Sequence, residues 1–211
     1  MSLTVTSLRN DPDRAGLRRF ADVLALRTGQ PVTVRFVEPG DGRALQAYFA
    51  TLSPTARYNR FTGASAGLSN QELDLLLHIG DDNRFAVIAE MAIDGVRTIV
   101  GEARYRFEAT TGRFEFGLSV HDAHQRQGIG RALLANLECR AAALGADTMF
   151  GDTLRTNREM QELAHSLGFA FSQTPGDWRE VRVVKAVEGG EDLPCAHHRN
   201  GVAGASHLLT A

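Results

Sequence analysis

The sequence predicts an α/β (α+β) fold in which a mixed, mostly antiparallel central sheet of about six to seven strands is flanked by helices. First, strand-like and helical runs alternate along a chain of 211 residues, and its 43% hydrophobic content is enough for one sizeable core. Second, three consecutive strand-like runs are separated only by short turn signals; they are Phe85 to Ile93, Thr98 to Phe107 and Arg113 to Val120. Third, a glycine-containing turn leads from the last of these runs into a long helical run.

Residues 1–30 are expected to form an N-terminal helical extension. Asp11 can cap a helix and Pro12 suits its first turn. The apolar residues on one helical face are Leu17, Phe20, Ala21 and Leu24. That face needs a partner, and it could cover an exposed groove or form a homodimer contact.

The main domain is expected to span residues 31–187. Its first strand covers Val32 to Val37, because β-branched residues favour extended backbone. A helix follows from about Asp41 to Leu52, and Pro54 interrupts it. Ser69 is a good cap for the next helix, which precedes the three strands already described.

The second half of the domain returns to alternating elements. Its predicted order is helix Gly128 to Leu144, strand Asp147 to Thr153, helix Asn157 to Leu167, and strands Phe169 to Ser172 and Arg179 to Ala186. Residues 188–211 are rich in glycine, alanine and histidine without periodicity. We expect them to be a loose tail or a segment that a partner orders.

Composition excludes several classes of function. A formal net charge of -2 provides no overall attraction to nucleic acid or to an anionic membrane, so any anion site must be local. No apolar run reaches the roughly 18–20 residues that span a bilayer, and a cytoplasmic location is expected. The two cysteines, Cys139 and Cys195, are expected to be free thiols. The spacing of Cys195 and the nearby histidines fits no standard zinc site, so no metal is expected.

The stretch from Gln125 to Arg131 has the composition of an anion site. The P-loop and dinucleotide patterns are both incomplete here. Gly128 and Gly130 would let the backbone approach a ligand, and the free amides of the following helical turn favour an anion. Arg126 and Arg131 can add charge-assisted hydrogen bonds. The alternative is a polar strand-to-helix turn that binds nothing.

Two motifs resemble those of the GNAT superfamily of acyl-CoA-dependent N-acetyltransferases. The run Gln125-Arg-Gln-Gly-Ile-Gly130 resembles its Gln/Arg-x-x-Gly-x-Gly/Ala motif, between a strand and a helix as in that family. The run from Asn157 to Phe169 is similar to its Asn-x-x-x-x-x-Leu-Tyr-x-x-Leu-Gly-Phe segment. Upstream, Leu52 to Phe61 and Leu68 to Leu73 resemble the acetyltransferase domain of bacterial Pat-type protein lysine acetyltransferases. The resemblance implies the GNAT fold and a transferase of the acyltransferase class.

The resemblance also implies acetyl-CoA as acyl donor. Its pyrophosphate would bind the amides of the glycine-containing loop, and its pantetheine arm would pair with the edge of the preceding strand. The cofactor-binding residues implied are Leu118, Ser119, Val120, Gln125, Arg126, Gln127, Gly128, Ile129, Gly130, Arg131 and Asn157.

Acetyl transfer to an amine requires a group that accepts a proton, because a free lysine has a pKa near ~10.4. Glu115 is the candidate catalytic residue, since the resemblance places it where Pat-type enzymes carry a glutamate general base. It alternates with Gly117 and Ser119, so the three positions share one face of a strand. The alternative is a solvated glutamate, or an ion-pair partner of Arg104 or Arg106.

The remaining catalytic groups are less defined by the sequence. A backbone amide near Val120 is the family-like donor to the oxyanion. The tyrosine that many relatives carry near the end of the second motif is replaced by Ala164. The CoA thiolate could therefore leave unassisted, or Ser166, His124 or water could protonate it.

Acceptor recognition is expected on the segment that borders the acceptor groove in this family. Its candidate residues are Arg57, Tyr58 and Arg60, with buried aromatics and solvated arginines as the alternative. By resemblance the favoured acceptor is a protein lysine. A small-molecule amine and an acyl-CoA-binding regulatory module with little catalysis are the competing hypotheses.

Overall fold

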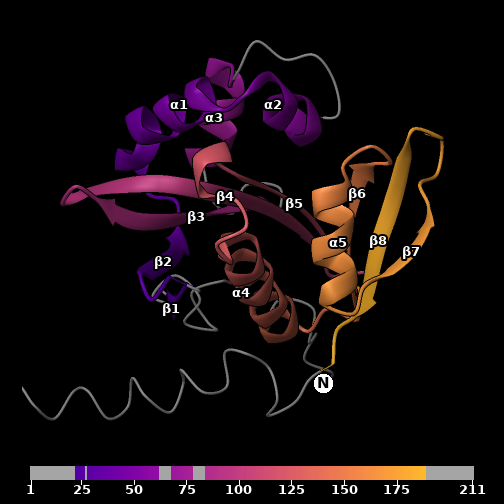
Figure 1. The fold of residues 1–211 in the computed structure, drawn as a ribbon. Helices are drawn as coiled ribbons and strands as arrows, with labels where there is room; N and C mark the ends of the chain where they lie inside the picture. The colour runs from indigo at the N-terminus through magenta and orange to yellow at the C-terminus, as the bar shows by residue number, and fades with distance from the viewer. Residues whose placement is uncertain (1–21, 27, 62–67, 78–83, 189–211) are drawn as a thin grey trace, which may run out of the picture.

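The computed structural model describes residues 22–26, 28–61, 68–77 and 84–188 (Figure 1). Within them, one eight-stranded sheet has the order β1-β2-β3-β4-β5-β6-β8-β7. The β5–β6 pairing is parallel and the others are antiparallel. The strands are β1 (Asp22–Ala25), β2 (Pro31–Phe36), β3 (Arg84–Ile93), β4 (Val96–Glu108), β5 (Arg113–Val120), β6 (Thr148–Leu154), β7 (Ala170–Gln173) and β8 (Glu180–Ala186). This is the mixed, mostly antiparallel sheet that the sequence predicts.

Helices cover both faces of the sheet (Figure 1). On one face lie α1 (Gly42–Thr51), α2 (Pro54–Phe61) and α3 (Asn70–Leu77), and on the other lie α4 (Ile129–Leu144) and α5 (Arg158–Ser166). Short 3₁₀ turns, η3 (Pro39–Asp41) and η5 (Asp122–His124), precede α1 and the α4 loop. Each helix layer encloses its own buried apolar cluster, so the sheet is apolar on both sides. No helix among the described residues is long and apolar enough to cross a membrane.

Local sequence signals account for most element boundaries. Asp94 and Gly95 both have positive φ, 50° and 79°, as a two-residue type I′ hairpin requires between β3 and β4. Ser69 caps α3 in a reciprocal capping box, in which its Oγ accepts from the Glu72 amide and the Glu72 carboxylate accepts from the Ser69 amide. Gly145 ends α4 in the left-handed conformation.

The N-terminal expectation is wrong in its described part. Residues 22–25 form strand β1, which pairs with β2 and places Leu24 opposite Val32, so the predicted helical face does not extend through Leu24. Four residues are too few for periodicity to distinguish a strand from a helix. This strand raises the count from the predicted six to seven to the observed eight. Residues 1–21 and 189–211 lie outside the described residues, and the proposed limits of both extensions stay predictions.

The expectation for one cysteine is also wrong. Cys139, which is buried on α4, is disulfide-bonded rather than a free thiol. Cys195 lies outside the described residues.

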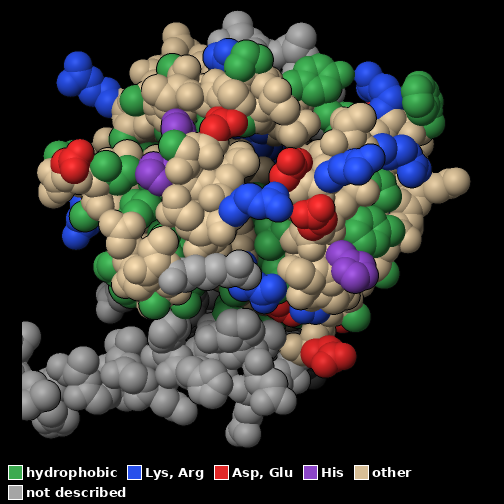
Figure 2. All heavy atoms as spheres, in the orientation of Figure 1, with side chains coloured by type: hydrophobic (Ala, Val, Ile, Leu, Met, Phe, Trp, Pro, Cys, Tyr) green, Lys and Arg blue, Asp and Glu red, His purple; other side chains and the backbone are tan. Residues whose placement is uncertain are grey.

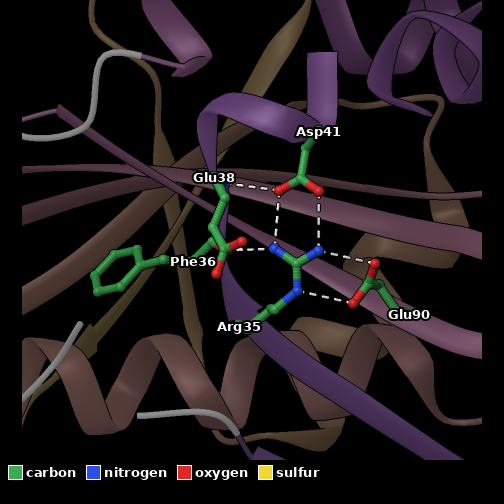
Figure 3. A network of polar contacts seen from close by, with 5 residues as sticks. All are labelled: Arg35, Phe36, Glu38, Asp41 and Glu90. Atoms are coloured by element: carbon green, nitrogen blue, oxygen red, sulfur yellow. Dashed lines mark hydrogen bonds and ion pairs between the residues drawn. The ribbon is translucent and has the colours of Figure 1, made fainter. Parts of the chain in front are cut away.

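A branched ion-pair network ties the first helix layer to the sheet (Figure 3). All five N–H donors of Arg35 on β2 form hydrogen bonds. Nη1 and Nη2 donate to the Asp41 carboxylate at 2.8 and 2.9 Å, and Nε and Nη2 donate to the Glu90 carboxylate at 2.8 and 2.9 Å. Nη1 also donates to the Phe36 carbonyl at 2.9 Å. Asp41 also accepts from the Glu38 amide. Burial would raise the pKa of Asp41, but the hydrogen bond from Arg35 lowers it overall. One guanidinium thus satisfies two carboxylates at the start of α1.

We predict that Arg35→Gln lowers the free energy of unfolding by roughly 2–4 kcal/mol, because it leaves two largely buried carboxylates without their cation. Urea denaturation followed by circular dichroism measures the effect. Arg97→Gln, at an exposed position on β4, is the control and should change the free energy by less than about 0.5 kcal/mol. Equal losses of unfolding free energy in the two variants would contradict this role of the Arg35 network.

Candidate functional site

The site begins where β5 separates from β6. The two strands pair only over Arg113–Glu115 and Thr148–Phe150, although both continue beyond. Past these residues each strand presents a free backbone edge, and two clefts open between the diverging strands and the helices. We call them the α4–α5 cleft and the α2–α3 cleft after the helices that line them. Figure 2 shows acidic and basic side chains around the hollow between the α1–α3 layer and the α5–β8 part of the molecule.

The α4–α5 cleft has a volume of about 660 Å³ and is lined by the residues implied for cofactor binding, with one exception. Those lining it are Leu118, Ser119, Val120, Gln125, Arg126, Gln127, Gly128, Gly130, Arg131 and Asn157. The exception is Ile129, whose side chain is only 1% exposed and packs in the core. Helical periodicity turns this side chain inward, and the binding role implied for Ile129 concerns its backbone amide. Its amide still belongs to the first turn of α4.

The loop before α4 adopts the backbone that its glycine predicts. Arg126 and Gly128 have positive φ, 61° and 106°, and Gly128 is the N-cap of α4. The amides of the next residues point out of the helix end without an intrahelical acceptor, which suits an anion. Gly130 has a second role beside the predicted clearance for a ligand. A Cβ there would lie 2.8 Å from Leu163 Cδ2, so Gly130 also lets α5 pack closely on α4.

The free edge of β5 faces the α4–α5 cleft. The His121 amide donates to Val100 of β4, whereas the Val120 carbonyl accepts from the Gln125 side chain on the opposite side at 3.2 Å. Because peptide groups alternate in an antiparallel pair, the N–H and C=O groups of Val120 and Leu118 point toward the cleft. This edge can pair with an extended ligand.

The α2–α3 cleft has a volume of about 570 Å³ and contains Glu115, which is exposed. Glu115 lies on the same sheet face as Gly117 and Ser119, as the alternation predicts. The register places Arg106 opposite Glu115 and Arg104 opposite Gly117. Arg104 and Arg106 therefore join Glu115 in one cleft.

The carboxylate of Glu102 on β4 is buried, and Glu102 lies opposite Ser119 of β5. The Glu102 side chain is 1% exposed, forms an ion pair with Arg60 Nε of α2 and lies 3.7 Å from Arg104 Nε. It also accepts from Ser119 Oγ at 3.3 Å, and Ser119 Oγ lies 2.9 Å from the hydroxyl of Tyr48 on α1. Burial alone would raise the pKa of Glu102, but the charges of Arg60 and Arg104 hold it below its ordinary value. Glu102 thus links the first helix layer to the sheet between the clefts.

The acceptor residues predicted from the sequence are only partly brought to the site. Arg60 lines both clefts, and Gly117 makes room for it, since a Cβ there would lie 3.4 Å from Arg60 Nη1. Arg57 and Tyr58 are absent from the lining of both clefts, and Tyr58 is 44% exposed. Tyr58 lies two positions before Arg60 on α2, so its side chain points in another direction.

Sequence reasoning missed several side chains of the α2–α3 cleft. They are Asn59, Arg84, Asp152 and Glu180. Arg104 and Arg106 were considered only as partners of Glu115. The period-two spacing of the two arginines was visible, but only the strand register shows which cleft they enter.

The candidates for protonating a leaving thiolate occupy different places. Ala164, at the position of the family tyrosine, is fully buried in the core and has no hydroxyl. Ser166 lines the α4–α5 cleft, where its hydroxyl donates to the Leu163 carbonyl at 2.8 Å and accepts from Arg131 at 3.2 Å. His124 is absent from the lining of both clefts. In the part of the chain that the structure describes, no group of three His, Cys, Asp or Glu side chains could hold a metal ion.

Comparison with known proteins points to one family. Residues 53–169 match the sequence profile of the acetyltransferase (GNAT) family. The acetyltransferase PA5475 of Pseudomonas aeruginosa is 29% identical over 159 residues, which cover 75% of this chain and 86% of that protein. The GNAT domain of S. lividans PAT superposes with a TM-score of 0.71 at 22% identity, covering 79% of this chain and 96% of that domain. Spermidine N-acetyltransferase from Vibrio cholerae, in complex with CoA and spermine, superposes with a TM-score of 0.60 at 18% identity. The superposition covers 74% of this chain and 95% of that enzyme.

We predict that Glu102→Gln lowers the free energy of unfolding at pH 7 by roughly 3–5 kcal/mol, because Arg60 and Arg104 lose their shared counter-charge. The lowered pKa of Glu102 means that the folded state favours its ionised form. The stabilisation is therefore present above the ordinary pKa of 4.5 and is lost as the pH falls through the lower folded pKa.

Urea denaturation at pH 7 and at pH 3 measures both effects. Glu188→Gln, at an exposed position after β8, is the matched control. A difference between wild type and Glu102→Gln that does not shrink at pH 3 would show that Glu102 acts by packing rather than by charge.

Proposed function

Because this chain belongs to the acetyltransferase (GNAT) family, we propose that it moves the acetyl group of acetyl-CoA to a primary amine, with a protein lysine as the favoured acceptor and Glu115 as general base. One observation carries the proposal. The α4–α5 cleft, with its anion-type loop and free strand edge, meets the α2–α3 cleft that contains Glu115. The residues that line both clefts are Asn59, Arg60, Leu118, Asn157 and Met160. A donor in one cleft can therefore meet an acceptor from the other in a ternary complex.

The donor would lie along the α4–α5 cleft. Its pyrophosphate binds the first-turn amides of α4, and Arg126 and Arg131 add positive charge. Its pantetheine arm pairs with the peptide groups of Leu118 and Val120, as an added strand would. Asn157 is held by its bonds to the Met160 amide and to Thr153 Oγ1, so its side chain forms a fixed wall at the junction.

The acceptor amine would be deprotonated in the α2–α3 cleft. Glu115 accepts the proton directly or through water, and the neutral nitrogen attacks the thioester carbonyl carbon. The C–N bond forms, the C–S bond breaks and CoA leaves as the thiolate. A backbone amide near Val120 donates to the oxyanion. Because Ala164 has no acidic group, the thiolate leaves unassisted or takes a proton from water or Ser166.

The acceptor is supported less directly than the donor. A protein lysine is favoured by the likeness of the Leu52–Phe61 and Leu68–Leu73 segments to Pat-type domains. A small-molecule amine is the alternative, and the spermine-bound fold of the Vibrio cholerae enzyme supports it. A screen of small amines and lysine peptides that reads CoA release distinguishes the two. We also propose a homodimer and a cytoplasmic location, which the molar mass in solution and cell fractionation would test.

We predict that Glu115→Gln lowers kcat for acetyl transfer by about 10²–10⁴-fold, because an amide cannot accept the proton. Acetyl-CoA affinity should not change, since Glu115 is absent from the lining of the α4–α5 cleft. Glu180→Gln is the control, because Glu180 lines the same α2–α3 cleft and should have a smaller effect. Wild-type turnover in Glu115→Gln would remove Glu115 from the mechanism.

We predict that Gly128→Ala weakens acetyl-CoA binding by about tenfold or more, since a side chain at a φ of 106° displaces the amides of the loop. Isothermal titration calorimetry measures the affinity. Gly145→Ala is the matched control, because Gly145 also has positive φ but lies at the other end of α4 with open space around it. Unchanged affinity in Gly128→Ala would show that the donor binds elsewhere.

A further inference from the structure

The two arginine networks of the first helix layer differ in charge balance. At Arg35, one guanidinium meets two carboxylates and all five N–H groups are bonded. At Glu102 the ratio is reversed, because Arg60 and Arg104 share one buried carboxylate. The second network therefore carries one positive charge more than its carboxylate can balance.

Three donor atoms of this second network have no acceptor. Nη2 of Arg60 and both Nε and Nη2 of Arg104 are buried and have no hydrogen-bond partner among the described residues, and Oε2 of Glu102, 3.7 Å from Arg104 Nε, is also unbonded. The Arg60 side chain is only 10% exposed, and an unbonded N–H in such a place is costly. Burial and the nearby charge of Arg60 lower the pKa of Arg104 to about 10, as expected for two cations that lack a second anion. Glu72 attracts both from a distance, but its carboxylate is used by Ser69 in the α3 cap.

Both arginines line the α2–α3 cleft, and the cleft is polarised. Its basic wall consists of Arg60, Arg84, Arg104 and Arg106. Its acidic wall consists of Glu115, Asp152 and Glu180. Asp152 is already paired with Arg182 at 2.6 and 2.8 Å, which leaves Glu115 and Glu180 to face the basic wall. A ligand with both charges would match these walls.

We propose that the acceptor amine belongs to a molecule that also carries a carboxylate, which binds the free Nη2 groups of Arg60 and Arg104 while the amine lies at Glu115. The inference rests on the proposed function. Arg104 is opposite Gly117, two residues from Glu115 on the same face, which is roughly 7 Å along the strand. An amine and a carboxylate several bonds apart fit this separation. The carboxylate could come from a free ω-amino acid or from an acidic residue beside a lysine in a peptide.

The first experiment compares matched acceptors with the wild-type chain. One pair is 6-aminohexanoate and 6-aminohexanamide, and the other is an acetylated Glu-Lys dipeptide amide and its Gln-Lys counterpart. We expect the carboxylate form to have a kcat/KM higher by about tenfold to a hundredfold in at least one pair, as for a charge-assisted hydrogen bond. A preference confined to one pair identifies the source of the carboxylate. Equal kcat/KM values within both pairs would overturn the inference and leave the proposed function intact.

The second experiment measures binding without turnover. The chain saturated with CoA is titrated with 6-aminohexanoate, the dipeptide and their neutral counterparts, and affinity is followed by calorimetry. We expect Arg104→Gln to abolish the discrimination between charged and neutral forms and Arg104→Lys to restore part of it. Arg97→Gln, an exposed arginine on β4, is the control.

Together the two experiments test the carboxylate site separately from the proposed acetyl transfer. Selective binding of a carboxylate form without acetylation would contradict the proposed function but keep the carboxylate site. Discrimination that survives in folded Arg104→Gln, verified by circular dichroism, would place the carboxylate elsewhere and overturn the inference.

Discussion

The short parallel pairing between β5 and β6 is the constraint on which the rest of the site depends. Gly151 lets the two strands stay close, since a Cβ there would lie 2.8 Å from the Phe116 carbonyl oxygen. Beyond that point the strands part, and the free peptide groups of β5 become an edge that an extended ligand can use. The same separation opens the α2–α3 cleft around Glu115. The proposed donor and acceptor surfaces therefore arise from one divergence of the backbone.

The Glu102 network places charge at the point where the clefts meet. A lone buried carboxylate would be costly, and Arg60 and Arg104 offset that cost. The ion pair with Glu102 also holds the Arg60 side chain over Gly117, between the two clefts. Tyr48 and Ser119 extend the network to α1, so the helix layer and the sheet share one set of polar contacts.

The Arg35 network and the Glu102 network differ in the hydrogen-bond donors that they leave for a ligand. Arg35 bonds through every donor and leaves nothing for a ligand. Arg60 and Arg104 keep buried donors unbonded and line a cleft. Proteins tolerate such unsatisfied groups mainly where function requires them, which agrees with the acceptor recognition proposed for the α2–α3 cleft.

The sequence alone determined the features that depend on neighbouring residues. The Ser69 cap, the Asp94-Gly95 hairpin and the turn at Gly128 follow from local backbone preferences, and the alternating strands and the loop motif indicated the sheet and the family. Only the tertiary structure showed that 22–25 is a strand, that Gly130 admits Leu163, and that Arg104 and Arg106 share a cleft with Glu115. These features depend on strand register and helix packing, which bring together residues far apart in the chain, so the pattern within one segment does not specify them.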